Sequence, residues 1–375
     1  MAENKRVTYL IGAGASANAL PVVNNMNDRI ELFINRIGSK DKDNRDRYIF
    51  KSNTVENPLA LFKEIKDHYT IDTLAKKYFL KYSSEENTAY LKNFLASYFY
   101  FEQVDNQKDS ILRFLMAEAI KNKPDDSDKI KDLYLMVNKN LDYRYDSFYA
   151  YYLQKLSGIN HLVLPNEINI ISWNYDSQFE IAYGRYCSNN ETLTDIQKKL
   201  QVYPNQQGAN IDEKNSCIIK LNGSATFRSD IGLNKDDTDL LNTKPITSFL
   251  SNLSLIVNNK EEINRTNIKF AWENDTESIK AREIASKILA RSDVVVVVGY
   301  SFPSFNRNVD RQIFQIFNEN YNKQLYSNAK RKIYIQDTEN NAPKIKDRLK
   351  AVGSNLFDVA EIYDDVDQFF IPPEL

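Results

Sequence analysis

The chain has 375 residues, of which 42% are hydrophobic and 27% are charged. This balance is typical of a folded globular protein and excludes a largely disordered chain. The 49 Lys and Arg residues nearly cancel the 51 Asp and Glu residues, so we expect no direct, nonspecific binding of nucleic acid. No signal-like apolar segment follows Met1, and no apolar run reaches the roughly 18 residues of a membrane span. We therefore expect a cytoplasmic protein that does not enter a membrane.

The cysteine content argues against a metal centre. Cys187 and Cys217 are the only cysteines, and they do not form the paired Cys-x-x-Cys motifs of a structural zinc site. We expect two reduced thiols and no bound metal.

The first predicted strand, Val7–Ile11, runs into a glycine-rich turn, and a helix is expected over residues 18–37. Gly12, Gly14 and Ala17 follow the G-x-G-x-x-A spacing of a dinucleotide-binding turn. There Gly12 would permit the tight turn, Gly14 would let the backbone approach a pyrophosphate, and the helix N-terminus would face the phosphates. A glycine-rich turn without a ligand is the alternative. A dehydrogenase should also show an acidic residue after a second strand about 20 residues further along the chain. A helix-rich block follows here instead, which argues against a hydride-transfer enzyme.

That block, from about Glu56 to Gly158, has helical periodicity and many Tyr and Phe residues. We interpret it as a helical subdomain inserted into a sheet domain. The predicted bounds are residues 56–165 for the helical subdomain and residues 1–55 with 166–375 for the sheet domain.

Strand signals return after the helical block and alternate with helices. The predicted strands are Ile168–Ser172, Cys217–Leu221, Val294–Val298, Lys332–Gln336 and Val359–Ile362, and the predicted helices are Gln178–Tyr183, Thr276–Ala290, Val309–Glu319 and Ala342–Val352. Residues 188–194 and 204–215 are expected to be surface loops. This alternation predicts an α/β protein with a Rossmann-like, doubly wound parallel sheet.

Polar residues follow several of these strands, and in a parallel sheet such strand ends face one crevice. Asn174 and Asp176 lie two residues apart, on one side of an extended segment. Such a pair could orient water, hold ribose hydroxyls and face a developing cation, or it could simply form an Asx turn or an N-cap for the helix that follows. Gly299 and Ser301 similarly follow Val294–Val298 and could hold ribose or phosphate, or form a plain strand–loop junction.

Four motifs occur in the order Gly-Ala-Gly-Ala-Ser, Asn-Tyr-Asp, Lys-Leu-x-Gly-Ser and Gly-Tyr-Ser-Phe-Pro-x-Phe-Asn. In this order they resemble the sirtuin-like NAD-binding domain of bacterial anti-phage defence proteins, over roughly residues 6–55 and 166–340. The resemblance implies a Rossmann-like sheet with a helical insertion, and an enzyme that cleaves NAD+ to nicotinamide and ADP-ribose. It implies a pyrophosphate loop at Gly12, Ala13, Gly14 and Ser16, and a catalytic and nicotinamide-side pair at Asn174 and Asp176. It further implies a ribose–phosphate loop at Gly299 and Ser301, and a contact with the adenosine ribose at Asp337.

The chain departs from the resemblance at two points. Two cysteines cannot build the four-cysteine zinc module of deacylating sirtuins, so deacylation is not expected. Asn222 stands where the family usually has a histidine, and an amide cannot act as a general base near neutral pH. Because nicotinamide is already a cationic leaving group, cleavage without that base could rest on holding the ribose, on stabilising positive charge near Asp176 and on excluding or placing water. Asn222 could still bond a ribose hydroxyl.

Three functional hypotheses follow from the sequence. The first is an NAD glycohydrolase effector, the second is a catalytically weak NAD or ADP-ribose sensor, and the third is a structural subunit that docks a partner. The sheet and the helical block use nearly the whole chain, so we expect any sensor to be a separate protein. The resemblance suggests an ATPase or a short argonaute-like protein, together with homo-oligomeric assembly.

Overall fold

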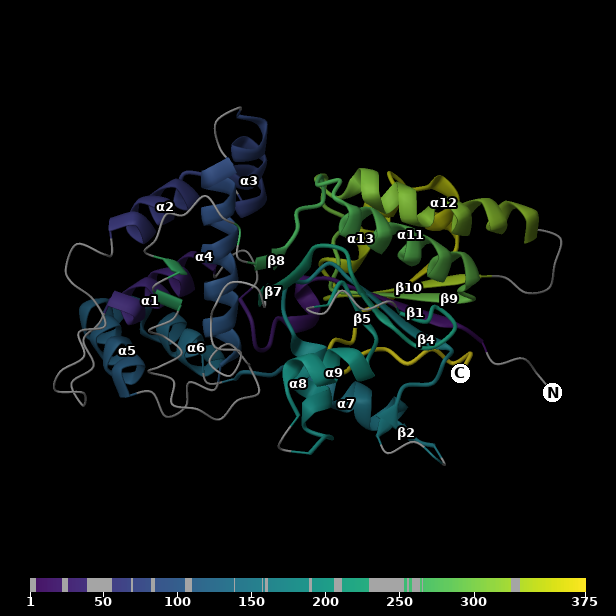
Figure 1. The fold of residues 1–375 in the computed structure, drawn as a ribbon, viewed down its shortest axis with the longest axis horizontal. Helices are drawn as coiled ribbons and strands as arrows, with labels where there is room; N and C mark the ends of the chain where they lie inside the picture. The colour runs from purple at the N-terminus through teal and green to yellow at the C-terminus, as the bar shows by residue number, and fades with distance from the viewer. Residues whose placement is uncertain are drawn as a thin grey trace. The chain divides into compact units, whose positions relative to one another are not determined.

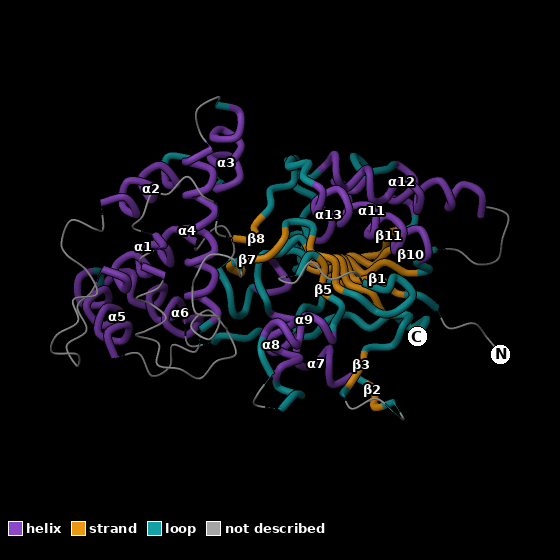
Figure 2. The backbone as a smooth tube through the Cα atoms, in the orientation of Figure 1, coloured by secondary structure: helices purple, strands orange, loops and turns teal. Residues whose placement is uncertain are grey.

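The computed structural model describes residues 5–21, 26–38, 56–68, 70–81, 85–104, 110–137, 139–156, 158, 161–188, 191–205, 211–228, 253–254, 256–257, 264, 266–324 and 331–375. Figures 1 and 2 show the helices and strands of these residues. No helix in the described residues is both long enough and apolar enough to cross a membrane.

The chain divides into two compact units. The sheet unit consists of Met1–Ser16, Tyr143–Ser224 and Lys269–Leu375, and the helical unit consists of Ala17–Asp142 and Ala225–Ile268. These bounds differ from the predicted 1–55, 56–165 and 166–375 at both ends of the helical block. The first helix belongs to the helical unit because Phe33 packs its ring against Phe94 and Phe101, with centroids 5.8 and 5.3 Å away.

The α-helices of the helical unit include α1 (Met26–Gly38), α2 (Glu56–Lys66), α3 (Ile71–Leu80), α4 (Glu85–Gln103), α5 (Ser110–Asn122) and α6 (Ser127–Val137). The helix α4 lies at its centre and is buried along most of its length. On α1, the fully buried Arg29 forms an ion pair with the fully buried Glu102 of α4. A second bond of Arg29, from Nη1 to the carbonyl oxygen of Leu133 at 3.0 Å, ties α1 to α6.

The sheet unit is built on seven parallel strands in the order β11-β10-β9-β1-β4-β6-β5. In chain order these strands are β1 (Val7–Ile11), β4 (Ile168–Ser172), β5 (Val202–Tyr203), β6 (Ile218–Lys220), β9 (Val294–Val298), β10 (Lys332–Gln336) and β11 (Ala360–Tyr363). Every residue of β1, β4 and β9 is buried, as expected for strands covered on both faces. The predicted α/β, doubly wound parallel sheet is therefore confirmed.

Helices cover both faces of this sheet. In Figure 1, α11 (Thr276–Arg291), α12 (Arg307–Gln324) and α13 (Ala342–Leu349) lie above it, and α7 (Tyr143–Tyr152), α8 (Gln178–Gly184) and α9 (Leu193–Lys199) lie below it. The smaller elements of the sheet unit are α14 (Ser354–Asp358) and the hairpin of β2 (Gln154–Lys155) with β3 (Leu162–Val163). The pair of β7 (Gly223–Phe227) with β8 (Thr266–Ile268) falls mostly within the helical unit. Tyr9 of β1 packs edge-on against Phe148 of α7, which explains why α7 belongs to the sheet unit.

The element directly after the glycine-rich turn differs from the prediction. Ala13–Ser16 form a four-residue 3-10 helix, η1, and residues 17–19 form turns. The α-helix begins at Met26, so a helix starting at residue 18 was wrong; residues 22–25 of that prediction lie outside the described chain. The cause is local, because Pro21 disfavours the helical conformation at Leu20. Within residues 12–21, which the structure describes without a gap, no α-helix begins whose N-terminus could face a phosphate.

A second difference concerns the predicted surface loops. Of residues 188–194, Leu193 opens α9, whose N-cap Thr192 forms a reciprocal capping box with Asp195. This signal was present in the sequence as Thr-x-x-Asp and was missed. In the second predicted loop, residues 204–205 and 211–215 lie outside helices and strands, as expected. Residues 189–190 of the first loop and 206–210 of the second lie outside the described chain.

Candidate functional site

The motif segments follow four neighbouring strands, β9, β1, β4 and β6. Main-chain hydrogen bonds join their ends: the Gly12 nitrogen donates to the Val298 oxygen at 2.9 Å, the Trp173 nitrogen to Ile11 at 3.0 Å, and the Leu221 nitrogen to Ser172 at 2.9 Å. The strand order reverses at β1: the strands that come next in the sequence, β4, β5 and β6, lie on one side of β1, and the later strands β9, β10 and β11 lie on the other side. Such a switch point is where ligands bind in open α/β sheets.

A buried hydrogen-bond network, here called the Ser16 network, joins Ser16, Tyr145, Asn174 and Asp176. The Ser16 hydroxyl donates to Asp176 Oδ2 at 2.8 Å, and Asn174 Nδ2 donates both to Ser16 Oγ at 3.3 Å and to the Gly12 oxygen at 3.0 Å. Ser16 Oγ and the Tyr145 hydroxyl lie 2.8 Å apart. Since the only proton of Ser16 is directed to Asp176, Tyr145 is the donor of that bond. Segments far apart in the sequence thus fix one carboxylate.

Asp176 is the ionisable group at the centre of this arrangement. Burial raises its pKa above the usual range, and the positive charge of Lys220, the Ser16 hydroxyl and the Gln178 N–H act in the opposite direction. Gln178 donates its main-chain N–H to Asp176 Oδ1 at 3.2 Å. Asp176 therefore also forms the Asx turn that was the alternative interpretation of this motif. The same carboxylate both shapes the turn and faces the network.

Asn222 has one satisfied and one unsatisfied side-chain atom. Its Nδ2 donates to the main-chain oxygen of Trp173 at 3.0 Å, and its own main-chain oxygen accepts from Lys269 at 2.8 Å. The residue is only 8% exposed. Its Oδ1 is buried and accepts no hydrogen bond from the described part of the chain. A buried acceptor without a partner costs about 1 to 3 kcal/mol, so this oxygen is a position where a ligand donor would be stabilising.

The glycines of the two loops are explained by loop–loop packing. A Cβ on Gly12 would lie 2.5 Å from Tyr300 Cα, and one on Gly14 would lie 2.8 Å from Gly299 Cα. Gly299 has φ +59°, and a Cβ there would lie 2.3 Å from the Ala15 nitrogen. The N–H groups of Gly12, Gly14 and Ala15 all donate to protein carbonyls. Contact of Gly12, Gly14 and Gly299 with a pyrophosphate or ribose stays a prediction.

The other predicted ligand-binding residues lie at the same sheet edge but outside the Ser16 network. Ala13 and Ser301 are exposed on the loops after β1 and β9. Asp337 follows β10, two strands away from β1, and its Oδ1 accepts the Thr338 N–H at 2.8 Å. No hydrogen bond found in the described residues joins these three to Asp176.

Two residues that hold the site carried no sequence signal for that role. Tyr145 completes the Ser16 network, and Arg144 donates from Nη2 to the carbonyl oxygens of Gly14 and Ala15, both at 3.0 Å. Both lie on α7, in a tyrosine-rich stretch whose pattern indicated helix packing only. His161, one of the two histidines of the chain, lies immediately before β3 rather than after a strand of the sheet.

An aromatic and carboxylate cluster supports the site from the β9 side. The ring of Tyr300 stacks on Trp173 at 5.7 Å and an interplanar angle of 13°. Its hydroxyl lies 2.9 Å from both carboxylate oxygens of Asp310 and accepts from Asn306 Nδ2 at 3.1 Å. Asp310 is fully buried, and this burial raises its pKa to about 8 against the opposing effect of the Tyr300 hydrogen bond.

The raised pKa of Asp310 predicts a pH-dependent stability. Between about pH 4 and pH 8 the folded protein binds a proton that the unfolded chain lacks, so raising the pH destabilises the fold by up to about 1.4 kcal/mol per pH unit. Asp310→Asn stays neutral, so its free energy of unfolding relative to the wild type should increase from pH 5 to pH 8 and level off above pH 8. Urea unfolding followed by tryptophan fluorescence measures this difference, and a constant difference over that range would contradict it.

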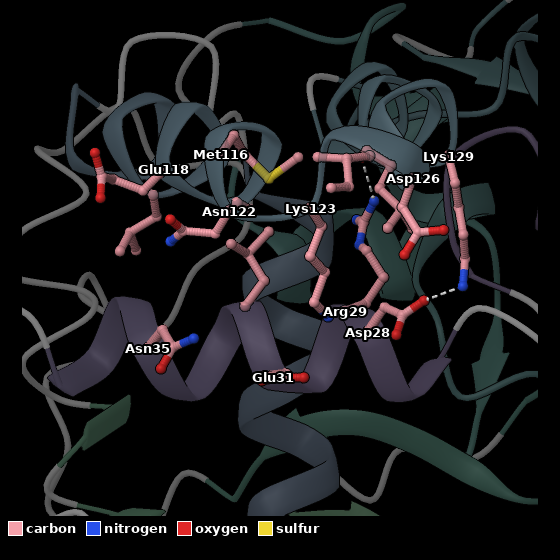
Figure 3. Close-up of a pocket in the computed structure, with 15 residues that line it drawn as sticks. Asp28, Arg29, Glu31, Asn35, Met116, Glu118, Asn122, Lys123, Asp126 and Lys129 are labelled. Carbon is pink, nitrogen blue, oxygen red and sulfur yellow. Dashed lines mark hydrogen bonds and ion pairs between the residues drawn. The ribbon is translucent and has the colours of Figure 1, made fainter.

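A separate hollow of about 330 Å³ lies within the helical unit, between α1, α5 and α6. Figure 3 shows Asp28, Glu31 and Asn35 of α1 facing Met116, Glu118 and Asn122 of α5, with Lys129 paired to Asp28 at 2.7 Å. Its walls combine apolar side chains with charges of both signs. Nothing in this mixture selects one class of ligand.

In the described residues, no group of three or more His, Cys, Asp and Glu side chains is placed to hold a metal ion. Cys217 is buried and Cys187 half-buried, and neither forms a disulfide. No protein-family model matches the chain, and no curated protein matches its sequence.

Proposed function

We propose that this protein is a sirtuin-like NAD+ glycohydrolase of a bacterial anti-phage defence system, which hydrolyses NAD+ to nicotinamide and ADP-ribose when a partner activates it. The observation that carries this function is the buried, unpartnered Oδ1 of Asn222, at the same sheet edge as the Ser16 network. A ribose hydroxyl is a donor of the kind this acceptor lacks.

The reaction breaks the bond between ribose C1′ and the nicotinamide nitrogen, and the bonding electrons leave with nicotinamide. Water then bonds to C1′ and loses one proton, which gives ADP-ribose. Positive charge develops on the ribose in the transition state, so a fixed carboxylate nearby stabilises it. Asp176 would supply that charge, while Asn222 Oδ1 would hold a ribose hydroxyl.

We propose a more specific role for Asn174 than the one inferred from its motif. Its Nδ2 is engaged by Gly12 and Ser16, whereas its Oδ1 makes no hydrogen bond to other described residues. Asn174 would therefore position Ser16 through its nitrogen and accept from the attacking water or a ribose hydroxyl through its oxygen.

Asn222 is the residue that tests the proposed substrate contact. We expect Asn222→Ala to lower kcat/KM for NAD+ about 5- to 30-fold, which corresponds to about 1 to 2 kcal/mol for one lost hydrogen bond. Asn222→His, which restores the residue usual in the family, should keep or raise the rate. Nicotinamide release and NAD+ calorimetry on the three proteins measure this. An unchanged kcat/KM in Asn222→Ala would exclude the contact.

The alternative function is a catalytically weak subunit that binds NAD or ADP-ribose as a sensor. Two observations favour it: the amide of Asn222 cannot act as a base, and the N–H groups of Gly12, Gly14 and Ala15 are already bonded within the protein. Tight binding of NAD+ without release of nicotinamide, with and without a partner, would select this alternative.

Control by assembly is part of the proposed function, because unregulated NAD+ cleavage would damage the cell that makes the enzyme. We propose a homo-oligomer and a separate activator, an ATPase or a short argonaute-like protein. Of the Tyr and Phe residues in the block from about Glu56 to Gly158, Tyr98, Tyr100, Phe101, Phe148, Tyr149 and Tyr152 are buried and form the interior, whereas Tyr151 is exposed. Candidates for docking in the helical unit are instead the exposed Phe79, Leu80, Phe114 and Leu135.

A further inference from the structure

Lys220 forms a buried ion pair beside the Ser16 network. Its Nζ lies 2.8 Å from Glu180 Oε1 and donates to the main-chain oxygen of Asp176 at 2.6 Å. The side chains of Lys220 and Glu180 are 2% and 0% exposed. Three elements thus meet at one ammonium group: β6 supplies Lys220, α8 supplies Glu180, and the segment after β4 supplies Asp176.

A buried ion pair of this kind is not explained by stability alone. Replacing such a pair with apolar residues of similar volume is often neutral or stabilising, because desolvation opposes the attraction of the charges. The pair is also incompletely satisfied, since Glu180 Oε2 has no donor among the described residues and Gln197 reaches Oε1 only at 3.5 Å. The bond from Lys220 to the main-chain oxygen of Asp176 indicates that the ion pair serves the candidate site.

We propose that Lys220 is a positioning residue for NAD+ cleavage, whose ammonium group holds the main chain of Asp176 and sets the electrostatic environment of its carboxylate, with Glu180 as the counter-ion. This inference rests on the proposed function, because Asp176 is assigned there to the developing positive charge. It also gives the lysine of the Lys-Leu-x-Gly-Ser motif a direct structural role.

The two members of the ion pair act on Asp176 with opposite signs. Burial raises the pKa of Asp176, the charge of Lys220 lowers it, and the charge of Glu180 raises it. The other polar groups that face this carboxylate are the Ser16 hydroxyl from η1, itself bonded to Tyr145 of α7, and the Gln178 N–H of α8. Removing the lysine charge should therefore favour protonated Asp176, and removing the glutamate charge should favour the carboxylate.

The test compares Lys220→Met with Glu180→Gln. We expect the acidic limb of the pH profile for NAD+ cleavage to move up by about one pH unit in Lys220→Met and to move down in Glu180→Gln. In Lys220→Arg, which retains the charge, the limb should stay near its wild-type position. The matched control is Lys287→Met, which breaks the exposed pair of Lys287 with Glu213 and should leave the profile unchanged. A limb that moves in the same direction in both variants, or in neither, would overturn the inference.

A second readout does not depend on catalysis. In protein labelled with ¹³C at aspartate carboxyl carbons, the resonance absent from Asp176→Asn reports the protonation of Asp176 without NAD+. Opposite shifts of its midpoint in the two variants support the role of Lys220, and equal midpoints contradict it. If Lys220→Met does not fold, Glu180→Gln and Lys220→Arg still decide the sign. A wild-type protein that neither binds nor cleaves NAD+ would refute the proposed function, whereas the titration decides the effect of Lys220 separately.

Discussion

Asp176→Asn should lower kcat for NAD+ cleavage about 100- to 1000-fold while leaving the fold intact. Removing one preorganised electrostatic group from a transition state typically has an effect of this size. The substituted amide keeps one oxygen, which can accept from the Gln178 N–H in place of Oδ1, and its NH2 group can donate to Ser16 Oγ in place of Oδ2; these two positions bond at 3.2 and 2.8 Å in the wild type, so the local structure should survive. The measurement is nicotinamide release under conditions in which the wild type is active, with the melting temperature of each protein recorded alongside.

The matched control is Asp347→Asn. Asp347 lies on α13 with its side chain 67% exposed, in an i,i+3 pair with Lys350, and such surface pairs contribute at most about 1 kcal/mol. This variant undergoes the same chemical change and should keep the wild-type rate. If Asp176→Asn retained more than about a tenth of the wild-type kcat, Asp176 would not be the stabilising carboxylate.

Gly299→Ala should have the largest effect on stability, lowering the free energy of unfolding by about 3 kcal/mol or more. Two physical causes combine at this position. The φ angle of +59° disfavours any residue with a side chain, and the added Cβ would lie 2.3 Å from the Ala15 nitrogen, a main-chain atom that cannot rotate away. The loops after β1 and β9 would have to separate, which should also weaken NAD+ binding. Urea unfolding and calorimetry measure the two effects.

Gly158→Ala separates these two causes. Gly158 has φ +83°, but none of the described residues comes within 4 Å of an added Cβ, so only the strain of the backbone conformation is expected. We expect a loss of about 1 to 2 kcal/mol there. Equal losses in the two variants would show that the contact between Gly299 and Ala15 does not contribute.

The sheet could be predicted because its strands carry their signal locally. Val294–Val298 is a run of five β-branched residues, and it forms β9 with the predicted bounds. Ile168–Ser172 likewise forms β4. A buried parallel strand needs apolar residues on both faces, so a short apolar run bounded by turn residues identifies it. The switch point then brings the polar residues after these strands to one sheet edge.

The contacts of the site could not be predicted, because they depend on segments far apart in the chain. The spacing of Gly12 and Gly14 suggested a ligand, whereas the structure places the Gly299 loop against both of them. Tyr145 gave only a helix-packing signal, yet its hydroxyl reaches Ser16 across 129 residues of sequence. Lys220 was part of a motif, but its contact with Asp176 required both the order of β4 and β6 and the position of α8.

Release of nicotinamide from NAD+ by the purified protein, alone and with the product of a neighbouring gene, tests the central claim most directly. We expect NAD+ to bind in calorimetry, and nicotinamide and ADP-ribose to appear in equal amounts, more rapidly with the activator, and with both binding and release weakened in Asn222→Ala. Absence of binding and of release under both conditions would contradict an NAD+ site at the carboxyl edge of β1, β4 and β6.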